Sequence, residues 1–126
     1  MSTILLVDDE VNILSGLSMA MSDEGYKVLT ATNGKEAWGL INENNVDLVI
    51  TDLRMPEMSG DELIKKVSSA YPTLPVIVLT GHGTIETAVE TMREGAIDFF
   101  TKPVDLDKLL LVVKKTIANS QLQEQN

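Results

Sequence analysis

The chain has 126 residues and carries 19 acidic against 10 basic side chains, a formal net charge of −9 at pH 7. It contains no cysteine, which excludes disulfides, thiolate metal sites and cysteine nucleophiles. The acidic balance argues against direct nucleic-acid binding, and no apolar run approaches the roughly 18 residues of a membrane span. We therefore expect one cytoplasmic domain with its own hydrophobic core.

Five short apolar runs, largely β-branched, alternate with stretches of helical spacing. In chain order they are Thr3–Val7, Lys27–Ala31, Asp47–Thr51, Pro75–Thr80 and Ala96–Thr101. Four of the runs are almost continuously apolar, which is typical of central parallel strands that are covered on both faces.

Between these runs, apolar side chains recur three and four residues apart, as on one face of a helix. The spacing predicts a fourth helix over about Thr84–Glu94 and a fifth over about Asp105–Ala118. Ser59 with Glu62 has the form of a capping box, and Gly95 stands where a left-handed helix end favours glycine. We expect five strand–helix units over residues 1–118. The polar, glutamine-rich segment 119–126 is expected to be a tail or the start of a linker to a missing output domain.

Strict alternation of strands and helices predicts a doubly wound α/β fold, with a parallel five-stranded sheet and helices on both faces. Ligands of such sheets bind at the carboxyl ends of the strands. Chemically active side chains follow four of the five ends: Asp8-Asp9-Glu10, Asp52, Thr80 and Lys102-Pro103. We expect these groups to meet at one edge of the sheet.

The candidate ligands at this edge are all oxygens, which favours Mg²⁺ over zinc. A carboxylate beside bound Mg²⁺ can attack phosphorus and form an acyl phosphate. The ammonium of Lys102 and the hydroxyl of Thr80 would then be donors for the phosphoryl oxygens. Each residue also has an ordinary interpretation, since acids favour helix N-termini and lysines are mostly solvated. The four strand ends taken together favour a site.

Over essentially its full length, the chain resembles the receiver domain of two-component response regulators. The resemblance rests on the order and spacing of four motifs: Leu6–Glu10, Asp52–Gly60, Leu79–Gly81 and Lys102-Pro103. The stretch from Thr80 to Pro103 looks most like the receivers of NtrC-type and FixJ-type transcription regulators. The resemblance implies a flavodoxin-like, CheY-like (βα)5 fold with strand order 2-1-3-4-5.

The resemblance also implies a role for each acid. Asp52 would accept a phosphoryl group from the phosphohistidine of a sensor histidine kinase. Asp9 would bind Mg²⁺ directly, and Asp8 would contribute mainly through a bound water. Asp52 and the backbone carbonyl of Arg54 would complete the protein's share of the metal shell.

The remaining motif residues would read out the phosphoryl group. Thr80 would donate a hydrogen bond to a phosphoryl oxygen, and Lys102 would pair with the phosphoryl charge. The Lys102–Pro103 peptide bond is expected to be cis, as is typical of the family. Phe99 is either an aromatic switch residue or a plain core phenyl. As a switch, it would rotate inward once phosphoryl recruits Thr80, and the surface of helix four, strand five and helix five would repack.

The implied partners are a sensor histidine kinase and an output domain or protein target, with homodimerisation through helices four and five as a further option. The chain would contact neither membrane nor nucleic acid, and its only chemistry would be self-phosphorylation and slow self-dephosphorylation. His82, the only histidine, is expected on a surface loop.

Three other readings can be weighed against this one. The first alternative is a stand-alone receiver that acts by direct protein binding or phosphorelay and is not part of a transcription regulator. A haloacid-dehalogenase-like phosphohydrolase is disfavoured, because the second aspartate of that family would fall at Arg54. A flavodoxin-like electron carrier is disfavoured because Asp8-Asp9-Glu10 would repel a flavin phosphate.

Overall fold

The computed structural model describes the backbone of residues 1–81 and 83–125 and the side chains of residues 1–81 and 83–119. Five parallel strands form one sheet in the order β2-β1-β3-β4-β5, which confirms the predicted fold class. The strands are β1 (Thr3–Val7), β2 (Lys27–Ala31), β3 (Leu48–Thr51), β4 (Val76–Thr80) and β5 (Asp98–Thr101).

Three strands begin slightly later than the apolar runs predicted. Pro75 has no backbone N–H to donate to a ladder, so β4 begins after it. The side chain of Asp47 accepts a hydrogen bond from the Thr3 N–H at 2.7 Å and closes the end of the sheet before β3. Ala96 donates its N–H to the Thr91 carbonyl of the preceding helix, so it belongs to the helix end and not to β5.

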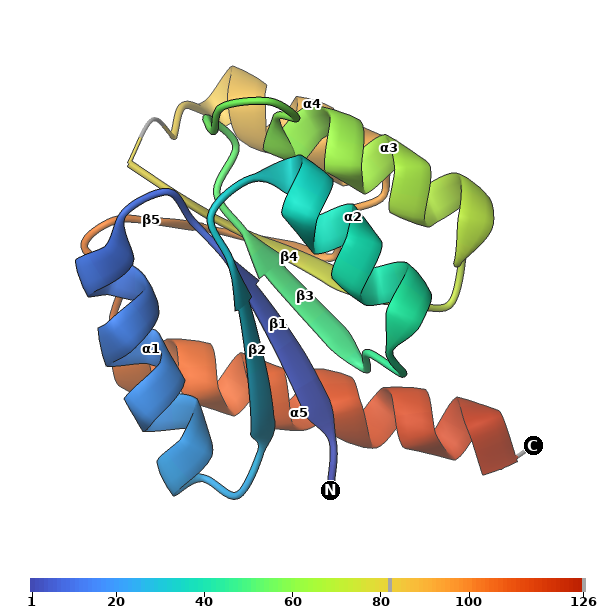
Figure 1. Ribbon diagram of the computed structural model, residues 1–126. Coiled ribbons are helices and arrows are strands. Elements are labelled where there is room, and N and C mark those ends of the chain that lie inside the picture. The colour runs from blue at the N-terminus through green and yellow to red at the C-terminus, as the bar shows by residue number, and fades with distance from the viewer. Residues whose placement is uncertain (82, 126) are drawn as a thin grey trace.

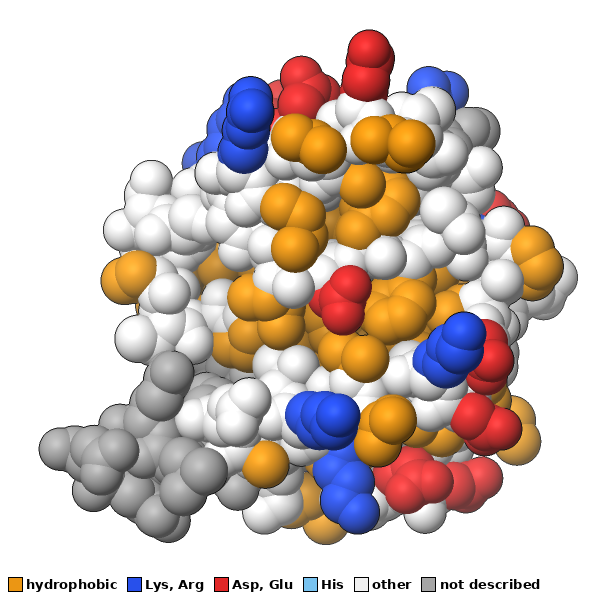
Figure 2. All heavy atoms as spheres, turned by 180° about the vertical axis from the view of Figure 1, so that it is seen from behind, with side chains coloured by type: hydrophobic (Ala, Val, Ile, Leu, Met, Phe, Trp, Pro, Cys, Tyr) orange, Lys and Arg blue, Asp and Glu red, His pale blue; other side chains and the backbone are white. Residues whose placement is uncertain are grey.

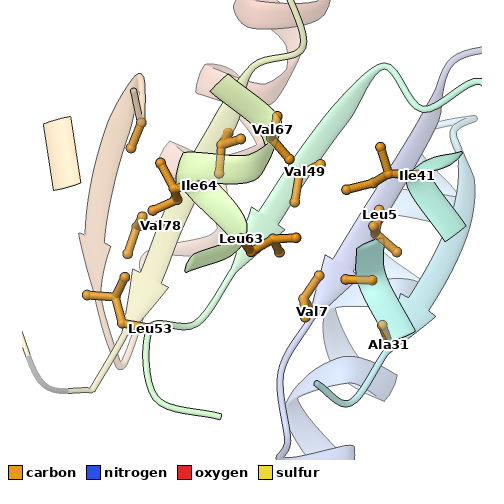
Figure 3. Packing of buried hydrophobic residues seen from close by; sticks show 13 residues of the cluster. Leu5, Val7, Ala31, Ile41, Val49, Leu53, Leu63, Ile64, Val67 and Val78 are labelled. Carbon is orange, nitrogen blue, oxygen red and sulfur yellow. The ribbon is translucent and has the colours of Figure 1, made fainter. Parts of the chain in front are cut away.

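Five helices cover the two faces of the sheet (Figure 1). They are α1 (Val11–Asp23), α2 (Gly34–Glu43), α3 (Gly60–Ala70), α4 (Ile85–Glu94) and α5 (Leu106–Gln125). Helices α1 and α5 pack on one face, and α2, α3 and α4 lie on the other. Side chains of a strand point alternately to the two faces, so each strand contributes to both cores. Leu5 and Val7 of β1 face α2 and α3 (Figure 3), whereas Ile4 and Leu6 face α1 and α5.

The predicted helix signals have the expected contacts. The Ser59 side chain accepts a hydrogen bond from the Glu62 N–H, and the Asn33 side chain accepts one from the Glu36 N–H, so α3 and α2 each begin at a capped residue. Gly95 follows α4 with a φ of 126°, a conformation that glycine adopts without strain.

Helix α5 continues to Gln125, beyond its predicted end at Ala118. The added residues include good helix formers and neither glycine nor proline, so nothing in them stops the helix. In the part of the chain that the structure describes, no helix is long and apolar enough to span a bilayer.

Helix α4 is held mainly at its carboxyl end. Its only buried residue is Thr91. At the end of the helix, the Ser68 hydroxyl of α3 donates a hydrogen bond to the Glu94 carbonyl at 2.9 Å. A Cβ atom on Gly95 would lie 2.0 Å from the Ser68 hydroxyl, so Gly95 packs closely against the Ser68 side chain. At the other end, Ile85 is 85% exposed.

Candidate functional site

The carboxyl ends of three strands bring buried charges together. Asp8 follows β1, Asp52 follows β3 and Lys102 follows β5. The Lys102 ammonium donates hydrogen bonds to Asp8 Oδ2 at 2.7 Å and to Asp52 Oδ2 at 2.9 Å. Glu10, the residue before α1, places its Oε1 atom 3.5 Å from the same ammonium. The predicted meeting of these strand ends at one edge of the sheet is therefore present in the structure.

The sheet fixes the backbone of each of these residues. The N–H groups of Asp8, Asp52 and Lys102 all donate to carbonyls of a neighbouring strand, so the ladder extends one residue past each strand end. The loop after β3 folds back closely on Asp52, and a Cβ atom on Gly60 would lie 2.1 Å from the Asp52 carbonyl oxygen. Only glycine fits there without a shift of the backbone.

The Asp52 carboxylate is held in its ionised form. Its Oδ1 atom accepts hydrogen bonds from the Leu53 N–H at 2.6 Å and from the Arg54 N–H at 3.4 Å. Burial opposes ionisation, but hydrogen bonds from Lys102 and Thr80 outweigh it and hold the pKa of Asp52 below its ordinary value. A carboxylate that is ionised at neutral pH can act as a nucleophile.

Asp8 and Lys102 respond to the same contacts differently. Burial raises the pKa of Asp8, and the hydrogen bonds from Lys102 and the Glu10 N–H offset this only in part. Burial also disfavours the charge of Lys102, but the bonds to its carboxylate partners prevail and raise the pKa of Lys102 above that of a free lysine. Three carboxylates and one ammonium give the site a formal charge of about −3 + 1 = −2 when all are ionised.

The donor set fits a hard divalent cation. Asp8, Glu10 and Asp52 each offer a carboxylate oxygen, and these atoms lie within 4.8 Å of one another. Such cations prefer oxygen ligands and would neutralise the local charge. Asp9, predicted as the direct metal ligand, is exposed and lies outside this group. The chain bends at Asp9, and the Glu10 N–H donates a hydrogen bond to Asp8 Oδ1 at 2.9 Å across the bend, so Glu10 and not Asp9 joins Asp8.

Thr80 and Lys102, which were predicted to contact the phosphoryl group, both bond the Asp52 carboxylate. Thr80 is buried at the end of β4, and the Lys102–Pro103 peptide bond is cis, as expected. Phe99 is half-buried on β5. A Cβ atom on Gly83 would lie 3.0 Å from the Phe99 ring, so the segment after β4 rests directly on that ring. Sequence reasoning did not identify Gly83, whose only signal is a glycine in a loop. His82 lies outside the described residues.

One hollow adjoins the site, and the structure also has an apolar surface. A hollow of about 480 Å³ lies beside Lys102, between α1 and the segment after β5. Hydrophobic side chains also gather over α4, β5 and α5 (Figure 2). The large exposed ones on these elements and the turn before β5 are Ile85, Val89, Met92, Ile97, Leu106 and Leu111.

Known proteins are similar to this chain in sequence and in fold. The family model described as the response regulator receiver domain matches residues 4–114. The transcriptional regulatory protein GlrR of Escherichia coli K12 is 43% identical over 117 residues, which are 93% of this chain and 26% of that protein. This chain spans about a quarter of the length of these curated relatives.

Two solved structures superpose closely. A response regulator receiver domain protein from Clostridium thermocellum gives a TM-score of 0.91 at 34% identity and covers 98% of this chain and 99% of that one. NtrX from Brucella abortus, in complex with ADP, also gives 0.91, at 38% identity, over 99% of this chain and 29% of that one. The strand order, the family match and these relatives agree, and the chain belongs to the response regulator receiver domains.

Proposed function

We propose that this receiver domain accepts a phosphoryl group on Asp52 and thereby controls an output domain or a separate protein target. The carrying observation is the Asp52 carboxylate itself, fixed at a strand end, kept ionised and bonded to Lys102 at 2.9 Å. The name of the E. coli relative, a transcriptional regulatory protein, supports transcription regulation as the output.

The donor would be the phosphohistidine of a sensor histidine kinase in the cytoplasm. An oxygen of Asp52 attacks the phosphorus, the bond from phosphorus to the donor imidazole breaks, and the imidazole leaves with the electron pair. Lys102 and Thr80 then donate to the phosphoryl oxygens from positions that already adjoin the Asp52 carboxylate. The hollow between α1 and the segment after β5 opens beside Lys102 and offers a surface for the kinase.

Acids at the same strand ends would bind Mg²⁺. Asp8, Asp52 and the Arg54 carbonyl would hold the ion, with Asp9 as a further ligand from the exposed side of the turn. Bound Mg²⁺ would offset the repulsion between the attacking carboxylate and the phosphoryl oxygens.

The signal would reach the surface through the segment after β4. Thr80 ends β4, and Gly83 of the following segment packs against the Phe99 ring. A shift of Thr80 toward the phosphoryl group would move this segment and change the packing of the ring. The apolar surface over α4, β5 and α5 would then present a different shape to an output domain or to a second copy of the chain (Figure 2).

Intact-mass spectrometry after incubation with acetyl phosphate tests the proposal. With Mg²⁺, we expect one base-labile phosphoryl adduct on the wild-type chain and none on Asp52→Asn. Asp23→Asn removes the same charge at the exposed end of α1 and should behave like the wild type. An adduct on Asp52→Asn at the wild-type rate would refute Asp52 as the acceptor. No adduct on any chain would indicate a receiver that acts by binding alone.

A further inference from the structure

We infer that Glu10 is a positioning residue for Lys102: its carboxylate holds the ammonium at the mouth of the site when a divalent cation occupies the buried acids. The inference rests on the proposed function, because the cation and the lysine belong to the same site.

The three contacts of Lys102 differ in burial. Its two partners at 2.7 and 2.9 Å, Asp8 and Asp52, have side chains only 5% and 6% exposed. The third partner, Glu10, lies at 3.5 Å and is 62% exposed. The ammonium therefore sits between a buried pair of acids and one acid at the solvent edge.

A divalent cation and the ammonium would compete for the same two buried carboxylates. An ion that binds both Asp8 and Asp52 would repel the Lys102 ammonium from its present place, since like charges a few ångströms apart repel strongly. Among the described residues, Glu10 is the one ion-pair partner of Lys102 outside this buried pair. Glu10 would thus receive the displaced ammonium and keep it close to the position where the phosphoryl group arrives.

The backbone at Glu10 suits this role. Its N–H donates to Asp8 Oδ1 at 2.9 Å, and its carbonyl accepts hydrogen bonds from Ile13 and Leu14 at the start of α1. The main chain is fixed on both sides, whereas the side chain extends to solvent and can follow the ammonium. Asp9 is exposed and lies outside the group that Asp8, Glu10 and Asp52 form.

Calorimetric titration with Mg²⁺ alone tests the assignment. We expect Glu10→Gln to weaken Mg²⁺ binding about fivefold, because the displaced ammonium then has no anionic partner. Asp23→Asn removes the same charge at the exposed carboxyl end of α1, away from the strand ends, and should change the affinity less than twofold, about the effect of a surface charge. In a Lys102→Met background there is no ammonium to hold, so Glu10→Gln should also change the affinity less than about twofold.

Glu10→Asp separates position from charge without altering Lys102. It keeps the negative charge but shortens the reach, so we expect an affinity between those of the wild type and Glu10→Gln. Two results would overturn the positioning role. One is wild-type Mg²⁺ affinity in Glu10→Asp, and the other is an equal loss of Mg²⁺ affinity on Glu10→Gln in the wild-type and the Lys102→Met chains. Either result would leave phosphorylation of Asp52 standing. A wild-type chain that binds no Mg²⁺ would overturn the proposed cation site and this assignment together.

Discussion

Replacement of Lys102 by methionine would remove the only cation that contacts the site carboxylates in the described part of the chain. Methionine keeps most of the length and apolar character of the lysine stem. The formal charge of the site changes from −2 to −3, and Asp8, Asp52 and Glu10 face one another with ligand atoms at most 4.8 Å apart. We expect this variant to fold with reduced stability in buffer without divalent cations.

The size of this loss in the free energy of unfolding follows from Coulomb's law and from proton uptake by the carboxylates. Two unit charges 4.8 Å apart repel by about 332/(20 × 4.8) ≈ 3.5 kcal/mol at an effective dielectric constant of about 20. Proton uptake limits the penalty, because protonation at pH 7 of a carboxyl with a pKa near 4 costs about 4 kcal/mol. Exposure of Glu10 to solvent weakens the repulsion further. We expect Lys102→Met to lower the free energy of unfolding by about 2 to 4 kcal/mol at pH 7.

The stability of the wild-type chain and of Lys102→Met should depend on pH in a defined direction. Because the pKa of Lys102 is raised on folding, its contribution is complete below the ordinary lysine pKa of about 10.4 and is lost only as pH rises beyond it. The deficit of Lys102→Met instead comes from ionised acids, so it should shrink between pH 7 and pH 5 as these acids bind protons. Mg²⁺ at about 100 times its Kd should restore about 2.7 kcal/mol at pH 7.

Urea denaturation followed by the fluorescence of Trp38 measures these changes. Trp38 is the only tryptophan, is half-buried and packs against the Tyr71 ring, so it reports loss of tertiary structure. Lys114→Met, at an exposed position of α5, is the matched control and should leave stability within about 0.5 kcal/mol of wild type. A Lys102→Met deficit that is absent at pH 7, or that does not narrow toward pH 5, would refute the electrostatic reasoning.

Three further outcomes are expected. Burial raises the pKa of Asp8, so its contribution to stability is present at acid pH and lost as pH rises; Asp8→Asn should therefore be more stable than wild type at pH 7 in urea denaturation. Gly83→Ala would place a Cβ atom 2.4 Å from Thr101 Cγ2 and should lower the free energy of unfolding by about 1 to 2 kcal/mol, whereas wild-type stability would show that Thr101 and Phe99 yield freely. Thr80→Ala should still gain the phosphoryl adduct, but the amide NMR shifts of α4 should no longer respond to it; an unchanged response would contradict the proposed route.

Most of the fold was predictable because each local signal agrees with the global one. Continuous apolar runs mark strands that are buried on both faces, and capped helices with one apolar face separate them. The extension of α5 was missed because the polar composition of residues 119–125 suggested a linker. Composition alone does not end a helix, and the segment lacks the glycine or proline that would. Strand β4 begins at Val76 because Pro75 has no N–H to donate to the ladder. The apolar pattern alone does not show this, because proline is itself apolar and continues the run.

For the site, the sequence predicts which strand ends come together but not which side chain of each end takes part. The choice between Asp9 and Glu10 depends on the bend at Asp9 and on the hydrogen bond from the Glu10 N–H to Asp8 Oδ1, just before α1 begins. The sequence does not fix the start of a helix or the bend before it to a single residue. The opposite pKa directions of Asp8 and Asp52 depend on hydrogen bonds to Thr80 and to backbone N–H groups that exist only in the folded chain.

The weak anchoring of α4 gives the domain two levels of stability. Helix α3 buries four residues, whereas α4 buries Thr91 alone, so the two helices should open with different free energies. Amide hydrogens of α4 should exchange with solvent through local openings, while those of β1 and β3 should exchange only when the whole domain unfolds. We therefore expect a perturbation at the strand ends to displace α4 before it disturbs the sheet.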